Sequence, residues 1–358
     1  MELLSVTMND GVMPRSEIES KDNSSEDKSN YKVVLTGDMV YNSMRMWQGA
    51  NGISPCDGIV SPAYTVLMPK VPISNGYFAA FFKSPNLINE FRRNSQGMTS
   101  DTWNLKYPQI ETIKVCIPAL SEQKRVSDML GTLERRIAKQ AQLVDNLKKY
   151  KRGVMQRIFR QLPTQNGAEW ACVRLGDIFK KVSRRNTDGV IKNVITNSAE
   201  YGLIPQRDFF DKDIAVDGNT ANYYVIENGD FVYNPRKSNS APYGPFNRYT
   251  LSEQGIISPL YTCLVLQADI SPSYLAWYFK SDAWYRYIYD NGSQGVRHDR
   301  VSMTDDLLMG IPVMYPSHVK QLLYADILDM VEARLQATQK TLDLLSKTRD
   351  GYMRQLFI

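Results

Sequence analysis

Residues 121–161 have the sequence SEQKRVSDMLGTLERRIAKQAQLVDNLKKYKRGVMQRIFRQ, in which large apolar residues return at an approximate seven-residue period. Such a period is typical of a helix that buries a narrow stripe against a second long helix. At 1.5 Å per residue this helix would be roughly 60 Å long. The predicted seam positions are Val126, Leu130, Leu133, Ile137, Val144, Leu147, Val154 and Ile158.

The same pattern returns 198 residues later, and it predicts a second long helix at the end of the chain. The polar interruptions of the seam also coincide, since Gln140 corresponds to Thr338 and Lys151 to Arg349. Ser121 and Ser317 are predicted to cap the two helices, because serine favours helix N-caps. The second set of seam positions is Tyr324, Leu328, Val331, Leu335, Leu342, Leu345, Tyr352 and Leu356.

The segments before the two helices repeat as well. GDMVYN at 37–42 returns as GDFVYN at 229–234, an offset of 192 residues (229 − 37), and YFAAFFKS at 77–84 returns as YLAWYFKS at 274–281. A repeat kept in order decides the architecture before any local pattern does. We therefore expect an α+β fold with two mixed domains in tandem, separated by two long helices that pair as an antiparallel coiled coil with pseudo-twofold symmetry. The predicted boundaries are 1–118, 119–163, 164–316 and 317–358.

Local patterns give a coarse assignment inside the two domains. Runs rich in β-branched and aromatic residues, bounded by Gly, Asn or Pro, predict strands. The expected strands are 32–35, 39–41, 64–67, 223–226, 231–233 and 261–266, and short aromatic helices are expected at 77–82 and 274–287.

The bulk composition limits the classes of function. The chain has 358 residues with 43% hydrophobic and 23% charged residues and a net charge of +5, which permits a nucleic-acid partner without requiring one. Its four cysteines are far apart and it has two histidines, so no metal site is expected, and the cysteines are expected to be reduced and largely buried. With no long apolar stretch and no signal-peptide pattern, the expected location is the cytoplasm, without a membrane partner.

No recognisable catalytic motif is present. Asn234-Pro235-Arg236-Lys237 begins like the Asn-Pro-Pro-Tyr loop of adenine methyltransferases, but the second proline and the aromatic residue are missing. The sequence also has no Walker-type loop, no Gly-x-Ser-x-Gly elbow and no nuclease carboxylate pattern. We therefore expect a protein that is not an enzyme and that binds no cofactor of its own.

The motifs resemble the specificity subunit of type I restriction–modification systems over essentially the whole chain. They are Ile117-Pro118-Ala119-Leu120-Ser121-Glu122-Gln123 at the start of the first long helix, Lys151–Gln156 at its end, and Trp170-x-x-Val173-x-Leu175-Gly176-Asp177-Ile178 at the opening of the second domain. The resemblance implies that each target-recognition domain binds one half of a bipartite site on double-stranded DNA. It further implies two methyltransferase subunits and restriction/translocase subunits as partners, with S-adenosylmethionine, ATP and Mg on those partners alone.

Two features depart from the family pattern. The counterpart of Trp170 would fall before residue 1, so the first recognition domain is expected to be short at its N-terminal start. The second long helix has Tyr315-Pro316-Ser317-His318 in place of the Ser-Glu-Gln start.

Candidate DNA-binding residues are polar and basic side chains in predicted loops, because Arg can bind guanine through two hydrogen bonds and Asn or Gln can bind adenine in the same way. Trp47 and Trp103 accompany them but are expected in the core, as is the aromatic cluster of 274–287. The candidates are Arg45, Arg92, Arg93 and Gln96 in the first domain, and Arg236, Lys237, Asn239, Arg297, His298 and Arg300 in the second.

Residues 121–162 hold eleven Lys or Arg against four Asp or Glu. The surplus indicates either a solvated helix face or a positive surface for DNA phosphates or an acidic partner. Two alternatives to a DNA-binding specificity subunit stay open: a coiled-coil scaffold that does not bind DNA, and an inactive or phase-varied relic of a specificity subunit.

Overall fold

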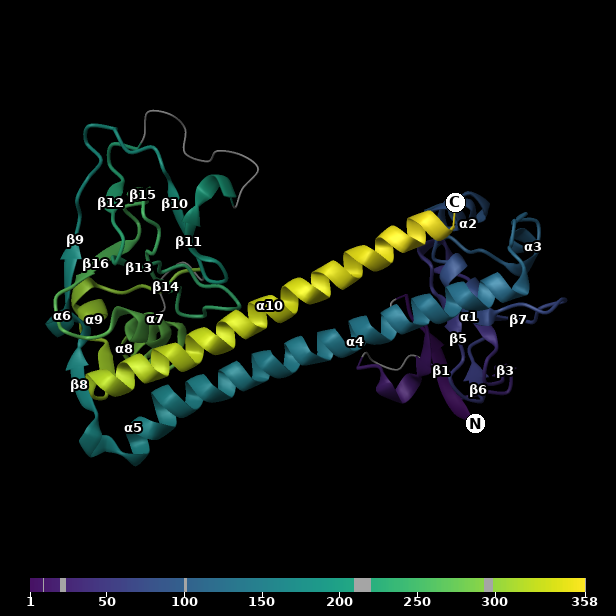
Figure 1. Ribbon diagram of the computed structural model, residues 1–358, viewed down its shortest axis with the longest axis horizontal. Coiled ribbons are helices and arrows are strands. Elements are labelled where there is room, and N and C mark those ends of the chain that lie inside the picture. Colours follow the sequence, from purple (N-terminus) through teal and green to yellow (C-terminus); the bar gives the residue numbers. More distant parts are fainter. Residues whose placement is uncertain (9, 20–23, 100–101, 209–219, 293–298, 358) are drawn as a thin grey trace. The chain divides into compact units, whose positions relative to one another are not determined.

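The computed structural model (Figure 1) describes residues 1–8, 10–19, 24–99, 102–208, 220–292 and 299–357. The chain divides into two compact units, residues 1–144 with 337–358 (unit 1) and residues 145–336 (unit 2). Each of the long helices, α4 (Leu120–Gln156) and α10 (His318–Leu356), contributes one part to each unit. The predicted fold class, two mixed helix-and-sheet domains with two long helices, is confirmed.

The repeated GDxVYN motif builds the same turn and strand in both units. Gly37 and Gly229 have φ angles of 90° and 100°, which favour glycine because side chains rarely adopt them. The next residue then accepts a backbone hydrogen bond across the turn. Asp38 Oδ2 accepts from Leu35 N at 2.9 Å, and Asp230 Oδ2 accepts from Glu227 N at 2.9 Å. The strands that follow are β4 (Met39–Asn42) and β13 (Phe231–Tyr233).

These strands occupy the centre of corresponding antiparallel sheets. In unit 1 the order is β5-β4-β7, and in unit 2 it is β14-β13-β16-β9. The flanking strands are β5 (Asn51–Ile53), β7 (Tyr64–Leu67), β14 (Phe246–Arg248), β16 (Thr262–Leu266) and β9 (Phe179–Val182).

A second sheet region is also repeated. In unit 1 it is the sheet β2-β1-β6-β3, where β1 pairs with β6 in parallel. In unit 2 the pairs β12–β15 and β10–β11 take the same places, joined by a parallel bridge from Val194 to Ile256. The strands are β1 (Glu2–Val6), β2 (Val12–Pro14), β3 (Lys32–Val34), β6 (Gly58–Val60), β10 (Ile195–Ser198), β11 (Gly202–Pro205), β12 (Tyr224–Ile226) and β15 (Gly255–Ile257).

Unit 2 has an opening element for which the described part of unit 1 shows no counterpart. It consists of β8 (Ala171–Arg174), α6 (Leu175–Ile178) and β9. β8 pairs with β17 (Pro312–Tyr315), whereas the equivalent residues Lys114–Ile117 form no strand and expose Val115 and Ile117. Among the described residues, Lys114–Ile117 therefore have no strand beside them that corresponds to β8 in unit 2.

The remaining helices are short. In unit 1 they are α1 (Asn75–Phe81), α2 (Pro85–Asn94), α3 (Tyr107–Ile110) and the 3-10 turns Arg15–Glu17 and Met46–Gln48. The helix predicted for 274–287 is broken into α7 (Pro272–Lys280) and α8 (Tyr285–Asn291), because the buried Ser281 ends the first helix and its hydroxyl donates to Tyr278 O at 2.6 Å. Unit 2 further contains the π-helical turn Arg157–Gln161, α5 (Leu162–Gln165), α9 (Asp305–Met309) and the 3-10 turns Gly167–Glu169 and Gln206–Asp208.

Each unit packs its aromatic domain helix against the end of a long helix. In unit 1 the ring of Phe357 lies 5.4 Å from Tyr77 and 5.4 Å from Phe81. In unit 2 the equivalent Phe159 lies 5.5 Å from Tyr274 and 5.8 Å from Tyr278. These rings belong to the main hydrophobic core of each unit.

A buried glutamine joins each domain to the other long helix of its unit. Gln123 accepts from Ser74 N at 3.0 Å and donates to Pro118 O at 2.9 Å. Gln321 accepts from Ser271 N at 2.8 Å and donates to Pro316 O at 2.9 Å. Ser74 and Ser271 are the N-caps of α1 and α7, so each glutamine fixes the start of a domain helix to the start of a long helix.

The structure corrects one predicted helix cap. α4 begins at Leu120, so Ser121 lies inside the helix and is not its N-cap. The missing Ser-Glu-Gln start of α10 has little structural consequence, because Gln321 occupies the place of Gln123.

We predict that Gln321→Ala lowers the free energy of unfolding by about 2 to 4 kcal/mol, because it leaves a buried amide and a buried carbonyl without partners. Urea unfolding of the full chain measures this. The matched control is Gln336→Ala on the exposed face of the same helix, expected to change stability by less than about 0.5 kcal/mol. Equal effects of the two substitutions would contradict the proposed role of Gln321.

We also predict that backbone amides of β17 exchange with deuterium orders of magnitude more slowly than those of Lys114–Ile117, since β17 is paired and the equivalent segment is not. Hydrogen–deuterium exchange with mass spectrometry tests this. β3 and β12 are equivalent strands that are paired in both units, and they serve as the control for a general difference in stability between the units. Equal protection of β17 and Lys114–Ile117 would contradict the prediction.

Candidate nucleic-acid interface

An asparagine ends the central strand of each unit and shapes the loop that follows. Asn42 Oδ1 accepts from Met44 N at 3.0 Å, and Asn234 Oδ1 accepts from Arg236 N at 2.9 Å. Asparagine stabilises turns through bonds of this kind. We call residues 42–45 and 234–237 the Asx loops. Neither asparagine was predicted to shape a loop in this way, although both are the last residue of the repeated GDxVYN motif.

Each Asx loop pairs with a segment far along the chain. Leu105 N donates to Ser43 O at 2.8 Å in unit 1, and Val301 N donates to Pro235 O at 2.9 Å in unit 2. This pairing places Trp103 beside the first loop. In the second it places Arg300 opposite Arg236 in an isolated antiparallel bridge.

In unit 1 the candidate residues other than Arg93 gather around this pairing. Trp47 and Trp103 meet edge to face at 5.1 Å, and the Arg92 guanidinium lies 5.5 Å from the Trp103 ring. Gln96 exchanges two backbone hydrogen bonds with Asn104, next to Trp103, and Arg45 is exposed on the Asx loop. Both tryptophans are half-buried and belong to none of the core clusters, so the expectation that they lie in the core is wrong.

Arg93 differs from the other unit 1 candidates. It forms an ion pair with Glu90 at 2.8 Å on the exposed face of α2, where a salt bridge contributes little to stability.

In unit 2 the Asx loop places two arginines and a lysine close together. Arg236 is exposed, Lys237 is half-buried, and Lys237 N donates to Asp299 O at 2.8 Å. Arg300 is half-buried, and its Nε has no hydrogen-bond partner among the described residues. Asn239 lies in the exposed turn between Ser238 and Ala241. The candidates Arg297 and His298 lie outside the described residues.

A cavity of about 400 Å³ lies beside this loop. Its lining combines the arginine with hydroxyl, carboxylate and apolar side chains, so it offers both charge and hydrogen bonds to a polar group. The residues include Tyr233, Pro235, Thr262, Arg300, Met303 and Asp305.

Glycine is required where the chain returns to the second Asx loop. Gly244 has a φ angle of 84°, and a Cβ atom there would lie 2.0 Å from Asn234 O. That close approach lets Asn234 N donate to Pro245 O at 2.9 Å.

The Asn234 side chain is not arranged to hold a flipped base. It is 6% exposed, its amide donates to Asn197 O at 3.3 Å, and its oxygen accepts from Arg236 N. Both of its polar atoms are therefore used inside the domain. This geometry argues against the methyltransferase interpretation of the Asn-Pro-Arg-Lys segment.

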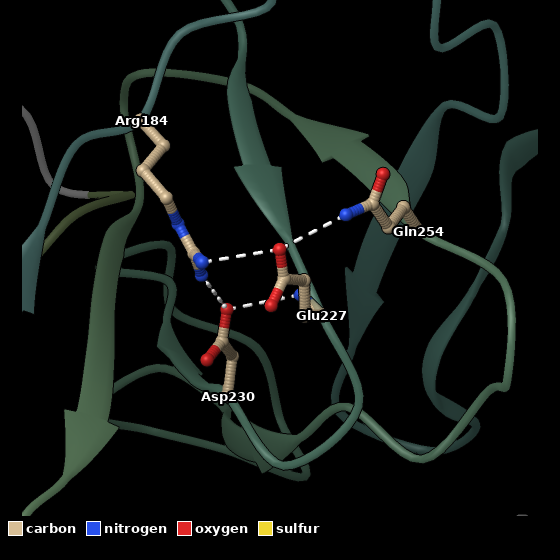
Figure 2. A network of polar contacts seen from close by, with 4 residues as sticks. All are labelled: Arg184, Glu227, Asp230 and Gln254. Carbon is tan, nitrogen blue, oxygen red and sulfur yellow. Dashed lines mark hydrogen bonds and ion pairs between the residues drawn. The ribbon is translucent and has the colours of Figure 1, made fainter.

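An ionic network lies elsewhere in unit 2 (Figure 2). Arg184 contacts Glu227 at 3.1 Å and Asp230 at 2.8 Å, and Gln254 donates to Glu227 at 2.9 Å. Burial raises the pKa of Asp230, while the Glu227 N–H and the Arg184 guanidinium act in the opposite direction. With the arginine between the two carboxylates, the network stabilises the turn before β13 and offers no free acid–base pair.

The cysteines show less burial than the sequence analysis expected. Cys116 and Cys172 are exposed, Cys56 is half-buried, and Cys263 is buried, where burial raises the pKa of its thiol to about 12. Among the described residues, no group of three His, Cys, Asp or Glu side chains could hold a metal ion. No helix in the described ranges is both long and apolar enough to cross a membrane.

The aromatic cluster predicted at 274–287 lies in or against the core, as expected, whereas Tyr289 of α8 is 67% exposed. Tyr274, Trp277, Tyr278 and Trp284 are buried, and Tyr285 and Tyr287 are half-buried. They are therefore not a surface on which bases could stack.

The long helices pair antiparallel in each unit. In unit 1 Gln140 Nε2 donates to Thr338 O at 2.9 Å and Arg349 lies 3.7 Å from Glu134, while in unit 2 Lys151 forms an ion pair with Glu332 at 2.6 Å. The two ion pairs are equivalent in the repeat, and Gln140 bonds to Thr338, its own equivalent in the repeat.

Most of the predicted seam positions are buried or half-buried. Val126, Leu130, Val144, Ile158 and Leu328 are buried, and Leu133, Ile137, Leu147, Val154, Tyr324, Val331, Leu335, Leu342 and Leu345 are half-buried. Leu356 and Tyr352 are exposed, at 36% and 39%, and correct the predicted seam. Met353 and Phe357 face the core instead, because the end of α10 packs on the aromatic helix α1.

The basic surplus of α4 is largely exposed. Arg125, Lys151 and Arg160 form ion pairs with Glu122, Glu332 and Asp282. The other basic residues that lie exposed on the helix and its final turn are Lys124, Arg135, Arg136, Lys139, Lys148, Lys149, Arg152 and Arg157.

The sequence matches no protein-family model and no curated protein. Its fold, however, matches solved structures. The type I restriction-modification system S subunit from M. genitalium aligns at 13% identity over 99% of this chain and 94% of that chain, with a TM-score of 0.58. A chain from a structure of the complex assembly and conformational transition of the type I R-M system aligns at 18% identity over 93% and 84%, with a TM-score of 0.55. The resemblance found in the sequence is thus confirmed at the level of the fold.

We predict that Gly244→Ala lowers the free energy of unfolding by more than the about 1–2 kcal/mol that a left-handed backbone costs a side chain. The additional loss comes from the contact with Asn234 O. Gly202→Ala is the control, because Gly202 has a φ angle of 76° and a Cβ atom there would meet nothing within 4 Å. Equal losses for the two variants, measured by urea unfolding, would contradict the role of Gly244 in closing the loop.

Proposed function

We propose that this chain is the DNA-recognition subunit of a type I restriction–modification system and that each unit binds one half of a bipartite target on double-stranded DNA. The main supporting observation is that two equivalent Asx loops, in a fold shared with an S subunit, each present an exposed arginine, Arg45 in the first loop and Arg236 in the second. The loops differ in sequence, although the same asparagine hydrogen bond shapes both.

The differences between the loops support two unlike half-sites. Arg45 is equivalent to Lys237, but Met44 is equivalent to Arg236. The segments paired with the loops also differ, since Trp103 accompanies the first and Arg300 the second. Arginine favours guanine edges and apolar side chains contact the thymine methyl group, so loops of different composition favour different bases.

Phosphate contacts would come from the basic residues of α4. Exposed lysines and arginines without sequence information position a protein on the duplex, and the bases are then contacted by loop residues. Lys148, Lys149 and Arg152 in unit 2, and Arg135, Arg136 and Lys139 in unit 1, are suited to this role.

The chain itself would perform no chemistry in this proposal. Two methyltransferase subunits and restriction/translocase subunits would act on the DNA, and S-adenosylmethionine, ATP and Mg would bind to them. A protein partner on α10 is supported by an exposed apolar stripe in unit 2, consisting of Val319, Leu322, Leu323 and Met330 at 77%, 46%, 52% and 65% exposure.

The test is co-expression of the full chain with the methyltransferase subunit of its system in a host free of DNA methylation, followed by sequencing of modified adenines. The proposal predicts one split motif with a fixed gap. Co-purification of the subunits without new methylation would favour the inactive relic, and failure of the subunits to associate would favour the scaffold that does not bind DNA.

We predict that Arg236→Ala relaxes base preference in one half of the motif and leaves the other half unchanged. Loss of one base contact corresponds to about 1–3 kcal/mol, or roughly 5- to 150-fold in relative affinity. Arg45→Ala is expected to affect the opposite half. Arg286→Ala is the control, because Arg286 is exposed, paired with Asp290 on α8 and outside both Asx loops. An unchanged motif in both loop variants would contradict the assignment of these loops.

A further inference from the structure

A charged triad recurs in both units next to the domain helix. In unit 2 it consists of Lys280, Glu332 and Lys151, and in unit 1 the equivalent residues are Lys83, Glu134 and Arg349. The glutamine bonds, the phenylalanine ring contacts and the ion pairs described above join equivalent residues in both units. The two places can therefore be compared directly.

In unit 2 the side chain of Trp277 on α7 lies beside the triad and contacts both long helices. The Trp277 ring lies 5.2 Å from Lys151 Nζ and 4.8 Å from Lys280 Nζ. Its Nε1 donates to Asp329 Oδ1 at 2.8 Å, and the side chain is 5% exposed. The ring thus receives two cations on its π system and satisfies its single donor.

In unit 1 both members of that pair are replaced by small residues. Ala80 stands for Trp277 and Gly131 for Asp329, while the triad is retained. Both small residues line a cavity of about 800 Å³. Its lining includes Ile53, Ala80, Lys83, Leu130, Glu134 and Arg349.

The cavity has room where the Trp277–Asp329 pair would stand. A Cβ atom on Gly131 would meet only Arg135 Nη1, at 3.6 Å, which is an ordinary contact. Gly131 lies in the middle of α4, where glycine destabilises a helix by about 1 kcal/mol relative to alanine. A glycine at this helix position leaves the adjacent part of the cavity open for a bound group.

We propose that this cavity of unit 1 binds an electron-rich aromatic ring with an N–H donor, of the indole class, in the place that Trp277 occupies in unit 2. Lys83 and Arg349 lie at the positions of the two cations that flank the Trp277 ring, and cations attract the face of an indole more strongly than other aromatic faces. Glu134 and Asp350 offer carboxylates to the N–H, and Ala80, Ile53 and Leu130 offer apolar contact. The volume lies in the range of small-molecule sites.

Burial favours such a ligand over an additional cation. Burial lowers the pKa of Lys83, with Glu134 acting against it and Arg349 with it. The charges of the lining already balance, since Lys83, Arg349 and Arg354 stand against Asp10, Glu134 and Asp350. A neutral ring can interact with the cations without disturbing that balance.

The first experiment titrates the full chain with indole and follows saturable binding by calorimetry and by the shift in Tm. Indole is expected to bind one site per chain and to raise the Tm. N-acetyl-tryptophanamide distinguishes the source of the ring: binding of both probes supports a tryptophan side chain on a partner, and binding of indole alone supports a free small molecule. Absence of saturable binding of both probes would overturn the proposal.

Two variants test the location. Ala80→Trp with Gly131→Asp rebuilds the arrangement of unit 2 and is expected to weaken indole binding at least tenfold. Trp277→Ala with Asp329→Gly empties the equivalent place in unit 2 and is expected to raise the stoichiometry from one to two. Unchanged binding in the rebuilt variant would show that indole binds elsewhere and would overturn the proposal even if the emptied variant failed to fold. Indole binding is measured without DNA, so failure of this proposal and failure of the proposed function can be distinguished.

Discussion

The fold depends on the buried side-chain amides of Gln123 and Gln321. Each amide bonds at one end to the N-cap of a domain helix and at the other end to the carbonyl before a long helix. Both glutamines are 2% exposed, so neither bond can be replaced by water without rearrangement. With the phenylalanine contacts of Phe159 and Phe357, they determine how each domain is held on its pair of helix segments.

This common frame explains why the rest of each unit can vary. The Asx loops differ in their side chains while Asn42 and Asn234 keep the same backbone bond. The space beside α1 differs from that beside α7, although Lys83 and Lys280 remain. A frame fixed by a few buried polar bonds tolerates such changes, because those bonds do not involve the residues that vary.

Sequence reasoning predicted the architecture well because the repeat and the heptad pattern are long-range signals. The six expected strands all lie where β3, β4, β7, β12, β13 and β16 form. The pairing of β8 with β17, and the absence of a strand at Lys114–Ile117 in the described structure, could not be predicted, because pairing between distant segments leaves no local pattern. Leu356 was misassigned because Met353 and Phe357, rather than the heptad positions, face the core beside the aromatic residues of α1.

The candidate site was predicted only in part. Residue type and predicted loop position identified Arg45, Arg92, Arg236 and Arg300, which lie on or near the Asx loops, but Arg93 belongs to a separate ion pair. The half-buried positions of Trp47 and Trp103 follow from tertiary pairing between Ser43 and Leu105, which the local sequence does not encode.

Hydroxyl-radical footprinting of the assembled methyltransferase complex on duplex DNA that carries its target is the most direct test of DNA recognition by both units. We expect two protected patches of sequence separated by a less protected gap, and we expect Arg236→Ala to weaken the patch of one half selectively. A single continuous patch, or protection that both loop variants leave unchanged, would contradict the claim that the two units recognise two halves of one DNA site.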